Sequence, residues 1–196
     1  MNVAAEPVAG TERVRFDPLT RIIHWLMVIG IVAMLVLGVM LWRQIGDYSW
    51  VQVAHQSIGI GVLVVAVIRI GNRVLRRAPR STLGRGERVL AAGGELAMYL
   101  LLLAQPIVGW AMSSATGAPV TLAYGLTLPS IAPADPHLFG ELRTLHIVLA
   151  WALVAVVSAH IGAVGFHTLV LRDGVASRML LGPTRGRSGR GRRYSP

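Results

Sequence analysis

Four long apolar runs constrain the fold of this chain more than any other feature. They are predicted to cover residues 22–42, 51–70, 89–112 and 145–171. Each run has about 20 residues or more, which at 1.5 Å per residue is enough to cross the hydrocarbon core of a bilayer. Only 14% of the residues are charged, whereas a soluble domain has about 25%. The sequence therefore predicts an all-α integral membrane protein with four spans.

Basic residues gather in the amino-terminal segment, in the connection after the second run and in the tail. That second connection and its borders contain Arg69, Arg73, Arg76, Arg77, Arg80, Arg85 and Arg88. Because cytoplasmic loops are enriched in Lys and Arg, we expect both termini in the cytoplasm and an antiparallel four-helix bundle. Residues 1–15 and 182–196 are expected to be disordered and cytoplasmic, leaving residues 16–181 as the membrane domain.

The net charge of +10 would raise the question of nucleic-acid binding in a soluble protein. Here the basic residues flank the apolar runs, so they are explained as topology signals, and we expect membrane lipid rather than nucleic acid as a partner. The chain has no cysteine. This excludes disulfides, iron–sulfur clusters held by thiolates and the covalent attachment of c-type haem.

Histidines inside the apolar runs are the candidate functional residues, because an ionisable side chain in a membrane is costly without a partner. His24 lies about one turn inside the first run, and His55 lies about one turn inside the second. His146 and His160 of the fourth run are 14 residues apart. This spacing puts both rings on one helix face, about 21 Å apart along the axis, which is typical of a helix that holds two cofactors.

Estimated depths match these histidines in pairs. When His146 is set level with His55, His160 falls close to the depth of His24, at 1.5 Å per residue. The resulting pairs are His55 with His146, and His24 with His160. Such pairs between facing helices can hold b-type haem through its iron. Centring the fourth run by hydrophobicity alone brings His167 level with His24 instead, so His167 is the competing ligand.

Helix-to-helix hydrogen bonding and zinc binding are the alternatives to haem for these histidines. Hydrogen bonds between helices would account for a single histidine, but less well for four at matched depths. Zinc usually takes three or four protein ligands, and no Cys or Asp near either pair completes such a set. His137 lies in the proline-rich connection and is expected to face solvent.

Several charged residues lie near the candidate sites. Arg143 comes one turn before His146, Arg21 one turn before His24, and Arg69 ends the second run. Each could contact an anionic haem propionate or reach the membrane interface. The third run has no histidine but contains Glu95, which either reaches the interface or takes part in proton or quinone chemistry.

These residues resemble the bacterial cytochrome b-561 family of four-helix, di-haem membrane proteins over about residues 16–181. The shared features are Leu19-Thr20-Arg21 before His24-Trp25, His55, Tyr99-Leu100-Leu101, Pro106-Ile107-Val108-Gly109, Tyr124-Gly125-Leu126-Thr127-Leu128-Pro129, and Leu142-Arg143 before His146, His160 and His167. The resemblance implies two haem b groups whose axial iron ligands are His24, His55, His146 and His160. Glu95 departs from relatives that have a histidine in the third span.

The resemblance also implies an activity in the bacterial inner membrane, that of a superoxide:quinone oxidoreductase. It would oxidise superoxide at the outer face and pass electrons through the haems to ubiquinone. Because superoxide is an anion, Arg143 beside His146 is the expected residue that attracts it to the reaction site. The alternatives are an electron-carrier or membrane-anchor subunit for a dehydrogenase or hydrogenase partner protein, and a haem-free transporter or structural bundle.

Overall fold

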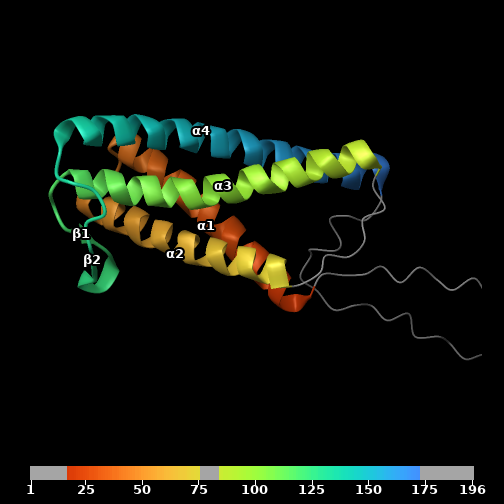
Figure 1. The fold of residues 1–196 in the computed structure, drawn as a ribbon, viewed down its shortest axis with the longest axis horizontal. Helices are drawn as coiled ribbons and strands as arrows, with labels where there is room; N and C mark the ends of the chain where they lie inside the picture. Colours follow the sequence, from red (N-terminus) through yellow and green to blue (C-terminus); the bar gives the residue numbers. More distant parts are fainter. Residues whose placement is uncertain (1–16, 76–83, 173–196) are drawn as a thin grey trace, which may run out of the picture.

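The computed structural model describes residues 17–75 and 84–172. Four long helices dominate this part of the chain: α1 (Pro18–Arg43), α2 (Tyr48–Leu75), α3 (Arg85–Ala115) and α4 (Pro136–Phe166), which continues into a π-helical turn, η2 (His167–Leu171). They form an elongated antiparallel bundle (Figure 1), and all four are long and apolar enough to cross a membrane. The predicted all-α membrane bundle is confirmed. The segments expected to be disordered, 1–15 and 182–196, and much of the basic connection, 76–83, lie outside the described residues.

Each helix extends beyond the apolar run that predicted it, and α4 begins nine residues before the expected residue 145. The carboxylate of Asp135 accepts hydrogen bonds from the backbone N–H groups of His137 and Leu138, at 2.7 and 3.2 Å. Pro136 then occupies the first helical position, where its missing N–H costs nothing. His137, expected in a loop, is therefore an exposed residue of the first turn of α4.

Aspartates also cap α1 and α2. Asp17 accepts a hydrogen bond from the backbone N–H of Leu19 at 3.2 Å. Asp47 accepts from the hydroxyl and the N–H of Ser49, at 2.6 and 2.9 Å, and from the N–H of Trp50 at 3.3 Å. These bonds hold the pKa of the Asp47 carboxyl below its ordinary value, and the bond from the Ser49 hydroxyl has the largest effect. Because these carboxylates accept hydrogen bonds from the first backbone N–H groups, α1 and α2 can begin before the apolar runs that predicted them.

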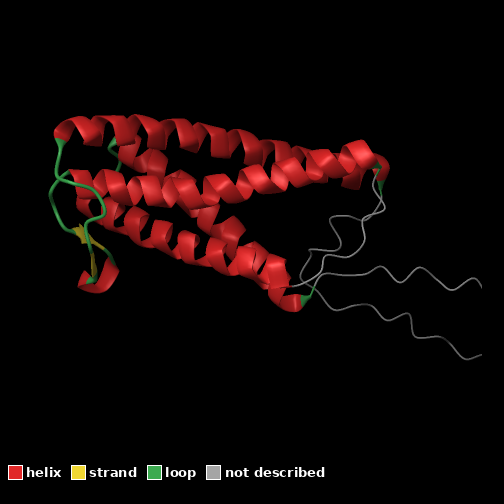
Figure 2. Cartoon of the chain, viewed as in Figure 1, coloured by secondary structure: helices red, strands yellow, loops and turns green. Residues whose placement is uncertain are grey.

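The connection between α3 and α4 contains a small antiparallel hairpin, residues 120–128. Strands β1 (Val120–Thr121) and β2 (Thr127–Leu128) pair around the turn η1 (Ala123–Gly125), as Figure 2 shows. The indole N–H of Trp110 donates to the Pro129 carbonyl at 3.0 Å, which ties the connection to α3. This hairpin and the link between α1 and α2 lie at the same end of the bundle, which we name the hairpin end. We name the other end the opposite end.

The buried core lies midway along the bundle and takes residues from all four helices: Met27, Ile31, Ala66, Leu102 and Leu153. Outside it, many large apolar side chains face outward, as expected for surfaces in contact with lipid. Helix α1 packs against α2, α3 packs against α4, and α2 joins the two pairs through α3. These two pairs diverge towards the opposite end (Figure 1).

Candidate functional site

His55 of α2 and His146 of α4 face each other near the hairpin end. Their ring centroids are 6.3 Å apart and the ring planes meet at 70°. Both side chains are half-buried. The Nδ1 atoms of both rings are buried and have no hydrogen-bond partner among the described residues. Because an unsatisfied polar atom is costly in a membrane interior, this pair is suited to bind a further group.

The spacing of the two rings fits a metal ion held between them. Two imidazole nitrogens that each bind one metal at about 2 Å place the ring centres about 6 Å apart. The described residues contain no group of three or more His, Cys, Asp or Glu side chains that could hold a metal. Two imidazoles therefore suit haem iron, whose macrocycle supplies the other ligands, better than they suit zinc.

Two glycines lie beside these rings. A Cβ atom on Gly109 of α3 would lie 3.0 Å from Cε1 of His146, closer than nine in ten real Cβ contacts. A Cβ atom on Gly38 of α1 would lie 3.7 Å from Cε1 of His55. Helix α3 thus shapes the site through the absence of a side chain at Gly109, whereas the distance at Gly38 is an ordinary van der Waals contact.

Gln105 of α3 is a site residue that was not predicted from the sequence. Its Nε2 donates to the backbone carbonyl of His146 at 3.2 Å and lies 3.3 Å from Nε2 of the same ring. A metal bound through Nε2 would replace the second contact, because one lone pair serves one partner, while the first could remain. The signal was present in the sequence as a polar residue one turn before Gly109, on the same face of an apolar helix.

His24, His160 and Arg69 come together from α1, α4 and α2 towards the opposite end. His24 lies within electrostatic range of both His160 and Arg69, and His160 lies within range of Arg69. His24 is half-buried, whereas His160 is exposed where the helix pairs diverge. The Nη1 atom of Arg69 is buried without a hydrogen-bond partner among the described residues. A guanidinium with a spare donor is suited to a carboxylate.

The remaining predicted residues occupy separate positions. Arg143 is exposed on α4, one turn from His146 towards the hairpin end. His167 begins η2, and its ring packs edge-on against Phe166 with centroids 6.2 Å apart. His137 is exposed, and its Nδ1 lies 3.5 Å from a carboxylate oxygen of Glu141.

Glu95 links α3 to α2. It forms a two-pronged ion pair with Arg73, in which Nε and Nη2 donate to the two carboxylate oxygens at 2.9 and 3.3 Å. The Tyr99 hydroxyl donates to the same carboxylate at 3.1 Å. Both partners of the ion pair are well exposed at 46% and 39%, so it adds at most about 1 kcal/mol. Glu95 therefore forms a contact between α3 and α2 towards the opposite end of the bundle.

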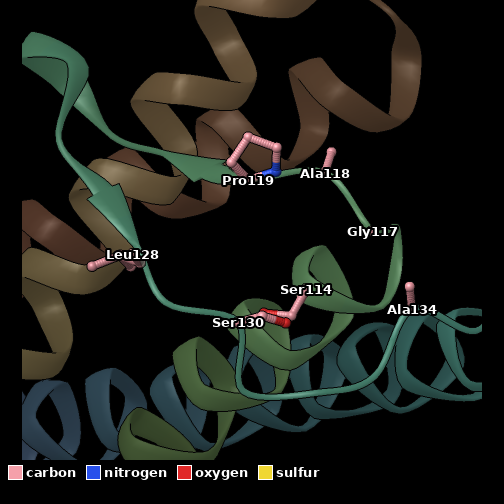
Figure 3. A pocket seen from close by; sticks show the side chains of 7 residues that line it. All are labelled: Ser114, Gly117, Ala118, Pro119, Leu128, Ser130 and Ala134. Atoms are coloured by element: carbon pink, nitrogen blue, oxygen red, sulfur yellow. The ribbon is translucent and has the colours of Figure 1, made fainter.

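An open hollow lies under the connection at the hairpin end (Figure 3). It is lined by Ser114, Gly117, Ala118, Pro119, Leu128, Ser130 and Ala134. The Ser114 hydroxyl accepts a hydrogen bond from the backbone N–H of Ile131 at 3.3 Å, and the Ser130 hydroxyl donates to the Ala132 carbonyl at 2.7 Å. Its polar groups serve the connection itself, and no lining residue is charged or ligates metals.

Known proteins resemble this chain over most of its length. A family model described as prokaryotic cytochrome b561 matches residues 15–182. Cytochrome b561 homolog 2 of Escherichia coli (strain K12) is 32% identical over 176 residues, which cover 85% of this chain and 91% of that protein. The probable superoxide oxidase CybB of Yersinia pestis is 29% identical over 168 residues, covering 81% and 91%. Cytochrome b562 of Cereibacter sphaeroides is 32% identical over 126 residues, covering 64% and 65%.

Proposed function

The chain belongs to the prokaryotic cytochrome b561 family of membrane electron-transfer proteins, and on this basis we propose that it oxidises superoxide and reduces ubiquinone in the bacterial inner membrane. The family implies haem b. The proposed activity draws on the similarity to a probable superoxide oxidase. The observation that carries the proposal is the facing pair His55 and His146, with ring centroids 6.3 Å apart.

Two b-type haems are proposed, one for each histidine pair. His55 and His146 would hold the first, and His24 and His160 would hold the second. Haem iron supplies one-electron chemistry when bound. The buried, unpartnered Nη1 of Arg69 supports a role for this residue in pairing with an anionic propionate of the second haem.

The bundle keeps the two proposed sites apart. Leu153 of the buried core lies midway between His146 and His160 on α4, two turns from each. Met27 and Leu102 pack in the same core. These apolar side chains exclude water from the middle of the bundle. One proposed site then lies on each side of this core along the membrane normal.

The arginines support an orientation with both termini in the cytoplasm. Among the described residues, only Arg43 and Arg143 lie at the hairpin end. Those towards the opposite end are Arg21, Arg69, Arg73, Arg85, Arg88 and Arg172. By the positive-inside rule the opposite end is cytoplasmic. The pair His55 and His146 then lies near the outer face, where superoxide would react.

Superoxide oxidation can be tested with purified protein in the presence of a ubiquinone analogue. A superoxide pulse is expected to reduce the haems, and the electrons should then appear as quinol. Reduced-minus-oxidised spectra follow the first step, and quinol absorbance follows the second. Haems that ignore superoxide would contradict the proposed activity and favour the electron-carrier or anchor subunit. Protein purified without a haem absorption band would contradict both.

Arg143→Ala is expected to slow the reaction with superoxide about threefold to tenfold at low ionic strength, because one cationic group near the outer site is lost. The rate should also become less sensitive to salt. Stopped-flow haem reduction at low and high salt measures both effects. Arg43→Ala is the matched control, since it removes the other exposed arginine of the same end. Equal effects of the two substitutions would exclude Arg143 as the specific steering group.

Gly109→Val is expected to lower the haem content towards one per chain, because the new side chain would enter the space of the His146 ring. Gly94→Val on the same helix is the control, since a Cβ atom there meets nothing within 4 Å. Both replace a helical glycine by valine, so helix propensity changes equally. The haem-to-protein ratio measures the difference. Equal haem content in the two variants would show that the close approach at Gly109 does not shape the site.

A further inference from the structure

The connection that carries the hairpin has an unusual composition for a loop between membrane spans. Residues 116–134 contain no charged side chain. They include several large apolar residues, and Tyr124, Leu126 and Ile131 are exposed. A connection that lies in water has no need to exclude charge, whereas one that enters the bilayer interface does, because charged groups are costly there. The composition thus favours contact with lipid.

The hairpin folds back along α2 rather than projecting beyond the bundle. The backbone N–H of Ala123 in its turn donates to the Ser57 hydroxyl at 2.8 Å. Ser57 lies nine residues after the start of α2 at Tyr48, or about 13 Å along the helix axis. It is two residues beyond His55. The turn of the hairpin therefore lies close to the level of His55, beside α2 (Figure 1).

The end of α3 is tied to the same part of α2. Gln56 Nε2 of α2 donates to the Ser113 hydroxyl of α3 at 3.2 Å, and α3 ends at Ala115. The connection thus begins beside this part of α2 and returns to it at the turn. Ser57 and Gln56 are neighbours on α2, so two independent hydrogen bonds set the same level.

The strands of the hairpin pair their backbones with each other, which lowers the cost of leaving water. Val120 pairs with Leu128 and Thr121 pairs with Thr127. The N–H of Leu122 donates to the Leu126 carbonyl at 2.7 Å. Together with the bond from Ala123 to Ser57, these contacts give the hairpin backbone partners that do not depend on water.

The turn directs its largest side chains outward. Tyr124 is fully exposed at 107%, and Leu126 is 61% exposed. Tyr124 has φ of 61° and is followed by Gly125 with φ of 74°, a left-handed conformation that is uncommon for a tyrosine. Tyrosine is enriched where a membrane meets water, because its ring is apolar and its hydroxyl is polar. Trp50 at the start of α2, 64% exposed, has the same character.

We propose that the turn of the hairpin, residues 123–126, is an anchor seated among the lipids of the membrane leaflet at the hairpin end. Tyr124 lies at the headgroup level and Leu126 contacts the acyl chains just below. The anchor holds the connection against α2 beside His55, through the bond from Ala123 to Ser57. The occupant of this surface is bilayer lipid. The proposal is independent of the electron-transfer activity.

Site-directed spin labelling tests this placement, because the chain contains no cysteine. Tyr124→Cys and Leu126→Cys are each labelled with a nitroxide in the full chain, in vesicles of phosphatidylcholine and phosphatidylglycerol. Gln44→Cys, an exposed position in the α1–α2 link at the same end, is the water-facing reference. Val64→Cys, an outward-facing position 52% exposed on α2, is the lipid-facing reference. Collision rates with oxygen and with a water-soluble nickel chelate measure the depth of each label.

The labels at positions 124 and 126 are expected to give an oxygen-to-nickel ratio several-fold above that of position 44 and at or below that of position 64. A ratio equal to that of position 44 would place the turn in water and overturn the proposal. Low collision rates with both reagents would mean that protein covers the turn, for example a second copy of the chain, and would also overturn it. Circular dichroism of each labelled variant checks that the helices are intact.

Discussion

His55→Ala is expected to remove one haem and leave the other in place. His55 and His146 face each other with ring centroids 6.3 Å apart, and alanine offers the iron no ligand to replace the imidazole. His24 and His160 lie beyond the buried core, so their site should keep its haem. The haem-to-protein ratio of the purified protein is expected to fall from about two to about one, and the reduced-minus-oxidised spectrum should lose one of its components.

His146→Ala and the double variant sharpen this test. Because both histidines would bind one iron, His146→Ala should give the same ratio and spectrum as His55→Ala, and combining the two should cause no further loss. His137→Ala is the matched control, since it removes an exposed histidine of α4 and should keep both haems. Equal loss of both haems from a single variant with unchanged helix content would contradict this pairing.

The second large effect is expected from His160→Ala, which should remove the haem at the opposite end, whereas His167→Ala should retain it. His24 is within electrostatic range of His160. His167 lies seven residues further along, in the π-helical turn after α4, about 10 Å beyond His160 along the axis. The haem-to-protein ratio again separates the two variants, with about one haem expected for His160→Ala and about two for His167→Ala.

A combined variant gives this assignment an independent check. His55→Ala with His160→Ala should bind no haem, because each substitution empties a different site. His55→Ala with His167→Ala should keep one haem. If His167→Ala instead behaves like His160→Ala, the fourth helix presents His167 to His24, as centring its apolar run by hydrophobicity implies. Circular dichroism confirms in each case that the bundle is still folded.

The ends of α4 show where sequence reasoning about the fold falls short. The apolar run predicted a span from residue 145, whereas the helix starts at Pro136. Hydrophobicity marks only the part of a helix that meets the membrane. The start of the helix is set by Asp135 and Pro136, a capping signal that was present in the sequence but lies outside the apolar run.

The polar contacts between helices could not be predicted in the same way. Glu95 could be recognised as a carboxylate near a membrane interface, but its partner Arg73 lies on another helix. Gln105 and Gly109 belong to the wall of a site whose histidine is on α4. Which residues of α3 face α4 depends on the rotation and tilt of both helices, and these follow from packing of the whole bundle.

The amino-acid sequence alone was enough to predict the four membrane helices and their antiparallel order, but it left open whether His160 or His167 lies level with His24. Length, hydrophobicity and rise per residue are properties of one segment at a time, so they can be read along the chain. The facing of the His55 and His146 rings and the return of the hairpin to Ser57 became visible in the packed bundle. Distances across a bundle depend on how separate helices rotate and pack against one another, and no single segment carries that information.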